Sequence, residues 1–257
     1  MLNFRNTNIF FTILLGALIV LHITMGLPLY IYFIVVFIYS LIVFYGCYYI
    51  AAGFFIKSIC SAKTDKKEIA ISFDDGPAQN FTPQVLAILK ENDISAAFFC
   101  IGSHIAGNEE LLRKINDEGH IIGNHSYTHD TWFDMFSSAK MLADMKQMDE
   151  AVNNVIGCRP RLFRPPYGVT NPNLKKAIIS GNYISIGWNM RSFDTVIKDE
   201  NKLLERISKG IKPGAVFLFH DTCASTLAAL PAFIKEVKVR GYTFARLDKM
   251  LNLPTYA

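Results

Sequence analysis

Hydrophobic positions divide the 257-residue chain into two unequal parts. The first 56 residues carry a single charged side chain, Arg5, and positions 9–56 are apolar almost without interruption. Since one membrane span needs about 20 apolar residues, this stretch is long enough for two helices, with a break at Gly26-Leu27-Pro28. The pattern predicts a membrane-anchoring hairpin over residues 1–56. A cleaved signal peptide is the alternative, although its apolar region would be only about 7 to 15 residues long.

From residue 68 onward, short apolar runs alternate with segments of helical periodicity. The runs predict seven strands, at 68–73, 96–100, 120–123, 162–164, 183–188, 215–219 and 242–245. The segments between them predict helices at 82–92, 108–118, 137–156, 171–180, 201–210 and 225–239. Strict alternation of strand and helix favours a parallel sheet with helices outside it, either open or closed into a barrel. Residues 68–257 are therefore predicted to form one domain.

The charged residues between the two parts bear on the membrane topology. Four lysines, Lys57, Lys63, Lys66 and Lys67, mark residues 57–67 as a basic linker that either meets anionic lipid headgroups or is simply solvated. Because Arg5 precedes the hairpin and these lysines follow it, the positive-inside rule places both ends in the cytoplasm. With a single span the domain would face outward, so the side of the membrane stays open.

The remaining composition excludes some classes of protein. A net charge of +4 is modest and the basic residues are scattered among acids, so no surface for nucleic acid is expected. Five cysteines without paired spacing give no disulfide framework, which agrees with a reducing compartment.

Residues whose side chains could take part in catalysis or ligand binding lie at the predicted strand ends. They are Asp74, Asp75, His125, Arg164, Trp188 and His220. Two adjacent acids reach one cleft only where the chain leaves the sheet, and Gly76-Pro77 supplies that exit. His129 adds a second imidazole four residues after His125. Because strand ends converge on one face of a parallel barrel, two imidazoles and one carboxylate predict a metal set, with the second carboxylate free as a base.

Five segments, taken in order, resemble the motifs of the polysaccharide deacetylases, carbohydrate esterase family 4. They are Ser72 to Pro77, His125 to His129, Arg164 to Gly168, Trp188 to Asp194, and Phe217 to Asp221. The resemblance covers roughly residues 67–251 and implies a distorted (β/α) barrel of about seven strands. The departures are small, with Ser72 where threonine is common and Phe217 where leucine is common.

The resemblance implies a metal site and a general base. Asp75, His125 and His129 would hold a divalent metal, with Zn²⁺ the expected ion. Asp74 would take a proton from the attacking water. Arg164 would pair with Asp74 and keep it ionised and oriented.

The resemblance also implies a general acid and a set of substrate-binding residues on other strands. His220 would protonate the departing amine. Asp194 would hydrogen-bond and tune either that histidine or its arginine neighbour, and Arg191 could share this role. The expected substrate-binding residues are Pro165, Tyr167 through its backbone N–H, Trp188 and Leu218.

The implied activity is metal-dependent hydrolysis of N-acetyl groups on amino sugars in a glycan such as peptidoglycan, a chitin-like chain or an exopolysaccharide, without an organic cofactor. One alternative is a deacylase of a lipid-linked amino sugar at the membrane face. Another is a catalytically silent sugar-binding protein of the membrane, which is expected to have lost a ligand or the base. The expected partners are a glycan or glycolipid bearing N-acetyl amino sugars and membrane lipid.

Overall fold

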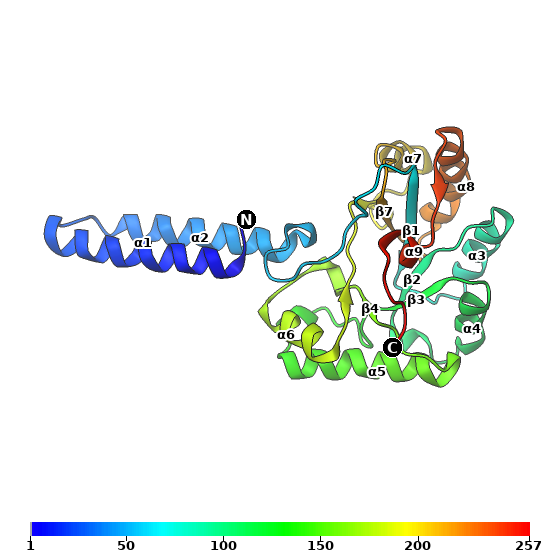
Figure 1. Ribbon diagram of the computed structural model, residues 1–257, viewed down its shortest axis with the longest axis horizontal. Helices are drawn as coiled ribbons and strands as arrows, with labels where there is room; N and C mark the ends of the chain where they lie inside the picture. The colour runs from blue at the N-terminus through cyan, green and yellow to red at the C-terminus, as the bar shows by residue number, and fades with distance from the viewer. Residues whose placement is uncertain (1) are drawn as a thin grey trace.

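The computed structural model describes residues 2–257, in which a helical hairpin projects from a rounded α/β domain (Figure 1). The hairpin consists of α1 (Phe4–Met25) and α2 (Tyr30–Tyr48). The Asn3 side chain caps the first turn of α1, and Gly26 ends the helix in the left-handed conformation with φ 71°. Both helices are long and apolar enough to cross a membrane, judged by length and composition. At 1.5 Å per residue the 22 residues of α1 span about 33 Å, close to the thickness of a bilayer core.

The open end of the hairpin is fastened to the domain. Phe4 N donates to Phe54 O at 3.1 Å, so the start of α1 lies beside the segment that follows α2 and the turn Ile50–Ala52. The Phe4 ring contacts the Phe54 and Phe55 rings at centroid distances of 6.0 and 4.9 Å. These aromatic side chains share one apolar cluster with α5 (Ser138–Ile156) and α6 (Pro172–Gly181).

The domain is built on one curved, parallel sheet, as predicted. Its strands are β1 (Glu68–Asp74), β2 (Ala97–Cys100), β3 (Ile121–Asn124), β4 (Leu162–Phe163), β5 (Ile184–Ser185), β6 (Met190–Arg191), β7 (Ala215–His220) and β8 (Thr243–Phe244). The order is β5-β4-β3-β2-β1-β7-β6, with β8 paired to the start of β1. The end strands β5 and β6 do not pair with each other within residues 2–257. The sheet is therefore an open, distorted barrel.

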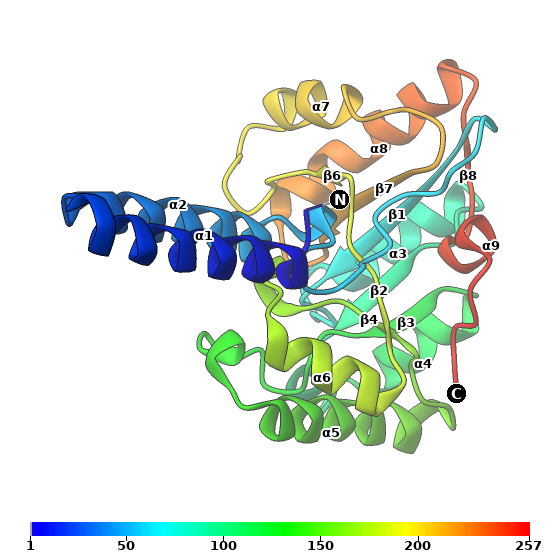
Figure 2. The same cartoon turned by 60° about the vertical axis from the view of Figure 1, so that its left-hand side comes forward.

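Helices cover the outside of this sheet (Figure 2). Besides α5 and α6 they are α3 (Thr82–Glu91), α4 (Glu109–Asp117), α7 (Glu200–Ser208) and α8 (Ala224–Val239). The short helix α9 (Leu247–Leu251) packs instead against the apolar cluster inside the barrel. The six predicted helices agree with α3 to α8 within a residue or two. The pattern missed β6 and α9, because elements of two and five residues are too short to show a period.

Side chains along β1 point alternately outward to the helices and inward to the interior of the barrel. Ile69, Ile71 and Phe73 point outward and belong to the main apolar cluster under the helices. Ala70 belongs to the inner cluster of the barrel, and Ser72 and Asp74 follow it at the same period of two. The interior of the barrel is therefore apolar at the start of β1 and polar at its end.

The segment 57–67 packs along the domain and is not a free linker. Ile59 forms a bridge with Ile186, and Ser61 forms one with Ala215, so the segment lies between the edges of the open barrel. Lys57 stays at the hairpin end. Lys67 instead reaches the start of β1, where its Nζ lies 5.7 Å from the centre of the Tyr242 ring. Lys57 and Lys67 therefore lie at opposite ends of this segment.

Candidate active site

A cavity of about 200 Å³ opens at the carboxyl ends of the strands. It is lined by Asp74, Asp75, His125, His129, Pro165, Tyr167, Gly168, Trp188, Arg191, Thr195, Leu218 and His220. Nine of the predicted site residues thus meet in one cavity. The other two, Arg164 and Asp194, are fully buried behind its wall.

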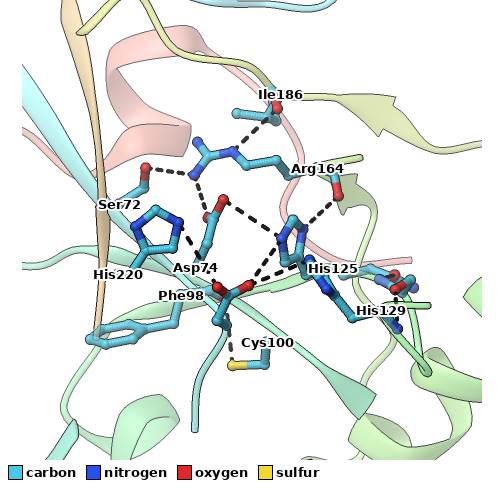
Figure 3. Close-up of polar contacts among 12 residues, drawn as sticks. Ser72, Asp74, Phe98, Cys100, His125, His129, Arg164, Ile186 and His220 are labelled. Atoms are coloured by element: carbon cyan, nitrogen blue, oxygen red, sulfur yellow. Dashed lines mark hydrogen bonds and ion pairs between the residues drawn. The ribbon is translucent and has the colours of Figure 1, made fainter. Parts of the chain in front are cut away.

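The three predicted metal ligands form one cluster, and Figure 3 shows two of them, His125 and His129, close together. One ligand atom from each of Asp75, His125 and His129 lies within 4.8 Å of the others. Asp75 Oδ1 is 3.5 Å from Nε2 of both histidines. His125 Nδ1 lies 2.8 Å from Arg164 O, and this contact leaves Nε2 directed into the cluster. A carbonyl partner on the far nitrogen is the usual way in which proteins orient a ligating imidazole.

The three ligands of the cluster differ in electrostatics: burial opposes the charged form of His125, but Asp74 and Asp75 outweigh burial and raise its pKa. Burial disfavours the charged form of Asp75, but His125, His220 and His129 outweigh burial and hold the pKa of this carboxyl below its usual range. Burial and the nearby His125 lower the pKa of His129 to about 4, so its imidazole is neutral and has a lone pair for a metal. The donor set of two imidazoles and one carboxylate, with further positions open, fits a catalytic divalent metal.

Asp74 has a different environment from its neighbour. Its Oδ1 accepts a hydrogen bond from Arg164 Nη1 at 2.6 Å, and the Arg164 side chain is completely buried. Nη1 also donates to Ser72 Oγ at 2.9 Å and Nη2 donates to Gly187 O at 3.1 Å. Nε donates to Ile186 O at 3.4 Å, so all three guanidinium nitrogens have a partner. The guanidinium carbon lies 4.0 Å from the centre of the Phe99 ring, which gives the cation an aromatic face. Arg164 is therefore held in one position, and it fixes Asp74 in turn.

His220 reaches the cavity from the opposite wall. It is in register with Asp74 across the β1–β7 pair, so both side chains enter from the same face of the sheet. Its Nδ1 lies 2.7 Å from Asp194 Oδ1, and its backbone N–H donates to Asp194 Oδ2 at 2.7 Å. Burial favours the neutral imidazole, but Asp194, followed by Asp74 and Asp75, outweighs burial and raises the pKa of His220 to about 8.

The structure places Asp194 beside His220 and not beside Arg164. Thr226 Oγ1 donates to Asp194 Oδ2 at 2.5 Å and holds this carboxylate from α8. Arg191 lies elsewhere, with its guanidinium carbon 5.0 Å from the centre of the Phe193 ring. Arg191 therefore lines the cavity without sharing the contacts of Asp194.

The predicted substrate wall surrounds the remaining side of the cavity. Trp188 and Leu218 are apolar lining residues, and Pro165 precedes Tyr167 in the loop after β4. Tyr167 has φ 59°, a left-handed conformation that is unusual for a residue with a side chain. Its hydroxyl donates to His129 O at 3.3 Å, so this loop is tied to the loop that carries the histidines.

Sequence patterns missed the residue that shapes the histidine loop. Asp144, on α5, accepts from Tyr127 N at 2.6 Å, from Thr128 N at 3.2 Å and from Thr128 Oγ1 at 2.7 Å. Asp144 is buried beside Met141 and Met145 on the inner face of α5. An acid within the apolar stripe of a predicted helix was the available signal, because a buried carboxylate needs partners.

Comparisons with known proteins identify the family of this arrangement. The sequence model for polysaccharide deacetylases matches residues 61–183. A peptidoglycan-N-acetylglucosamine deacetylase of Bacillus cereus is 32% identical over 193 residues, which are 73% of this chain and 90% of that protein. The chain belongs to the polysaccharide deacetylase family.

Two further relatives define the extent of the likeness. PgdA of Listeria monocytogenes, a peptidoglycan-N-acetylglucosamine deacetylase, is 30% identical over 202 residues, which are 79% of this chain but 42% of PgdA. The chain thus spans less than half the length of that relative. The crystal structure of the Bc1960 peptidoglycan N-acetylglucosamine deacetylase superposes with a TM-score of 0.73 at 27% identity, covering 77% of this chain and 94% of the other. The distorted barrel of the polysaccharide deacetylase family is thus the fold of this domain.

Proposed function

We propose that this chain is a metal-dependent N-deacetylase of amino sugars in a glycan. One observation carries the proposal: a three-ligand metal set, a separate carboxylate and a separate imidazole surround one cavity. The names of the relatives favour the amino sugars of peptidoglycan as the substrate. Residues 68–257 would be the catalytic domain, with residues 1–56 as its anchor and residues 57–67 between them.

The proposed roles of the residues follow from their places around the cavity. Asp75, His125 and His129 would hold the divalent metal, with Zn²⁺ the ion that best suits this donor set. Such an ion polarises a carbonyl and lowers the pKa of a nearby water. Hydrolysis adds water across the amide, so the C–N bond breaks and a carboxylate and a free amine are released.

Proton transfer would be divided between the two walls. Asp74 would accept the proton of the attacking water, held in place by Arg164. His220, protonated through its contact with Asp194, would give a proton to the departing amine. The backbone N–H of Tyr167 would stabilise the developing oxyanion, while Pro165, Trp188 and Leu218 would hold the acyl group.

A direct assay tests this function. The full-length protein should release acetate from N-acetylglucosamine oligomers or peptidoglycan. It should lose activity in a chelator and regain it when Zn²⁺ is restored. Protein that carries a full equivalent of metal and yet releases no acetate from any amino sugar would instead support the catalytically silent sugar-binding protein. The presence of both the ligands and the base favours the enzyme.

We also propose that the hairpin anchors the chain in a membrane. Two apolar helices whose open ends are fastened to the domain support an integral anchor over a cleaved leader. The chain should stay in the membrane fraction after a carbonate wash at high pH. Protease protection would define the side of the membrane on which the domain lies, with the charge bias around the hairpin favouring the cytoplasm.

A lipid-linked amino sugar is the second candidate substrate, favoured by one contact. Thr170 N donates to Cys47 O at 2.9 Å, in the last turn of α2. Thr170 is two residues after Gly168, which lines the cavity, and two residues span at most about 7 Å. The cavity wall is therefore close to the end of the membrane helix. Comparing acetate release from a polyprenyl-linked amino sugar in vesicles with release from soluble polymer would separate the two substrates.

A further inference from the structure

A second cleft lies between the hairpin and α6, outside the active site. It has a volume of about 750 Å³. Its lining residues are Asn3, Phe4, Arg5, Gly53, Phe54, Phe55, Ile56, Lys57, Pro172, Lys175, Lys176, Ile178 and Ile179. None of these residues belongs to the cavity that holds the catalytic groups.

The charge of this cleft is one-sided. Arg5, Lys57, Lys175 and Lys176 are all exposed, and no acidic side chain lines the cleft. Within residues 2–257 these four side chains form no ion pair with an acid. They come from the first turn of α1, from the segment after α2 and from α6, so folding brings together cations that are far apart in the sequence. Four unpaired cations around one cleft favour an anionic occupant.

The floor of the cleft is apolar. Phe54, Phe55 and Ile56 are buried beneath it, while the side chain of Ile179 on α6 is 68% exposed. A small soluble anion would leave this apolar surface in contact with water. An occupant with a charged head and a hydrocarbon part would cover both kinds of surface.

The position of the cleft relative to the hairpin indicates which amphipathic ligand it binds. The cleft lies at the domain end of the hairpin, and residues from the start of α1 and from α6 both line it (Figures 1 and 2). If the hairpin crosses the bilayer, this end is at the level of the lipid headgroups, since α1 alone spans about 33 Å. We propose that the cleft binds the headgroup of an anionic phospholipid, with its phosphate among the four cations and the upper part of its acyl chains against Phe54, Phe55 and Ile179.

This site would fix the domain against the membrane through contacts that the hairpin alone does not supply. α6 follows the loop that carries Pro165 and Tyr167, so lipid bound at α6 would also fix the height of the active-site cavity above the membrane. The proposal rests on the membrane hairpin and does not depend on the catalytic activity.

Native mass spectrometry of the full-length protein in detergent tests the site. Phosphatidylglycerol, phosphatidylcholine and inorganic phosphate would be titrated separately. We expect one tightly bound phosphatidylglycerol per chain and weaker binding of phosphatidylcholine. Lys175→Ala/Lys176→Ala should weaken the binding of phosphatidylglycerol by about 30-fold, since each basic side chain near a headgroup contributes roughly a fivefold change in affinity.

Arg113→Ala/Lys114→Ala is the matched control, because it also removes two adjacent exposed cations, from α4 on another side of the domain. Lys57→Ala tests the cleft without changing α6. Equal lipid binding by the wild type and all variants would overturn the proposal, as would equal affinity for the two phospholipids. Displacement of the lipid by inorganic phosphate at matched concentration would also overturn it, because it would show a site for a free anion. Acetate release and carbonate extraction of the same variants report on the enzyme and on the anchor separately.

Discussion

The two walls of the active-site cavity carry different chemistry. The wall formed by the ends of β1, β3 and β4 holds two carboxylates, two imidazoles and a buried guanidinium in mutual contact. The wall formed by β6, β7 and the loops beside them carries one imidazole, His220, with Asp194 behind it, together with Arg191 and the apolar side chains of Trp188 and Leu218. The first wall carries the ligands that suit a metal cation, whereas the second wall holds a proton on His220.

The adjacent acids show how strongly position on the first wall matters. Asp74 still belongs to β1, and its side chain is 4% exposed and bonded to Arg164. Asp75 has left the strand with φ 75°, and its side chain is 28% exposed and faces the two histidines. One residue of chain thus separates a carboxylate that is held by a cation of the protein from one that is available to a metal ion.

Removing a metal ligand from the first wall should have the largest effect. Asp75→Ala and His125→Ala should abolish both metal binding and acetate release, because each deletes one of three protein ligands. Metal analysis of the purified variants measures this directly. Asp117→Ala, which changes an exposed acid on α4, should keep its metal. A full equivalent of metal in both ligand variants would show that the cluster is not the metal site.

Asp74→Asn should separate the two adjacent acids. It should keep the metal and lose about 10² to 10⁴ in kcat, the usual contribution of a general base. Metal content and kcat measured on the same sample make the comparison with Asp75→Ala. An Asp74→Asn enzyme with wild-type activity would contradict the division of roles between these neighbours.

Asp194→Asn should change the second wall and leave the metal in place. Asp194 raises the pKa of His220 to about 8, so the acid form persists at neutral pH and is lost as the pH rises through that value. Without this carboxylate the pKa should fall toward the ordinary value of about 6.5. The alkaline limb of kcat should therefore move to lower pH, with a loss of about 10- to 100-fold at pH 8 and a smaller loss at pH 6. An unchanged pH profile would mean that Asp194 serves only the fold.

Leu218→Ala should have the smallest effect on catalysis. The side chain is 2% exposed and lines the cavity, so its loss should lower kcat/KM for acetyl substrates by about tenfold through weaker apolar contact. The variant should also accept a propionyl group better relative to acetyl, because the wall recedes. Thermal unfolding should be followed in parallel, since a buried Leu→Ala change costs about 2 to 5 kcal/mol of stability. An unchanged propionyl-to-acetyl ratio would place the acyl group elsewhere.

Much of the fold was readable from local patterns. The apolar runs of β1 and β7 are strong because both faces of these strands are buried. The periodicity of α3 to α8 is strong because these helices bury one face against the sheet. β6 is the exception, as its two residues gain their structure from pairing with β7. The candidate site was readable for a related reason. Parallel strands bring their ends together, so polar residues after apolar runs had to meet.

The sequence by itself determined the hairpin length, the βα alternation and the residue types at the strand ends, because these follow from local periodicity and composition. The tertiary structure decided which residues these polar side chains contact. Whether Asp194 would contact His220 or Arg164 depended on the path of the chain between β6 and β7. Asp144 became a support for the histidine loop only because α5 packs beneath β3. The cleft of Arg5, Lys57, Lys175 and Lys176 exists only because the hairpin base docks on α6, and contacts between segments far apart in the chain leave no local pattern to read.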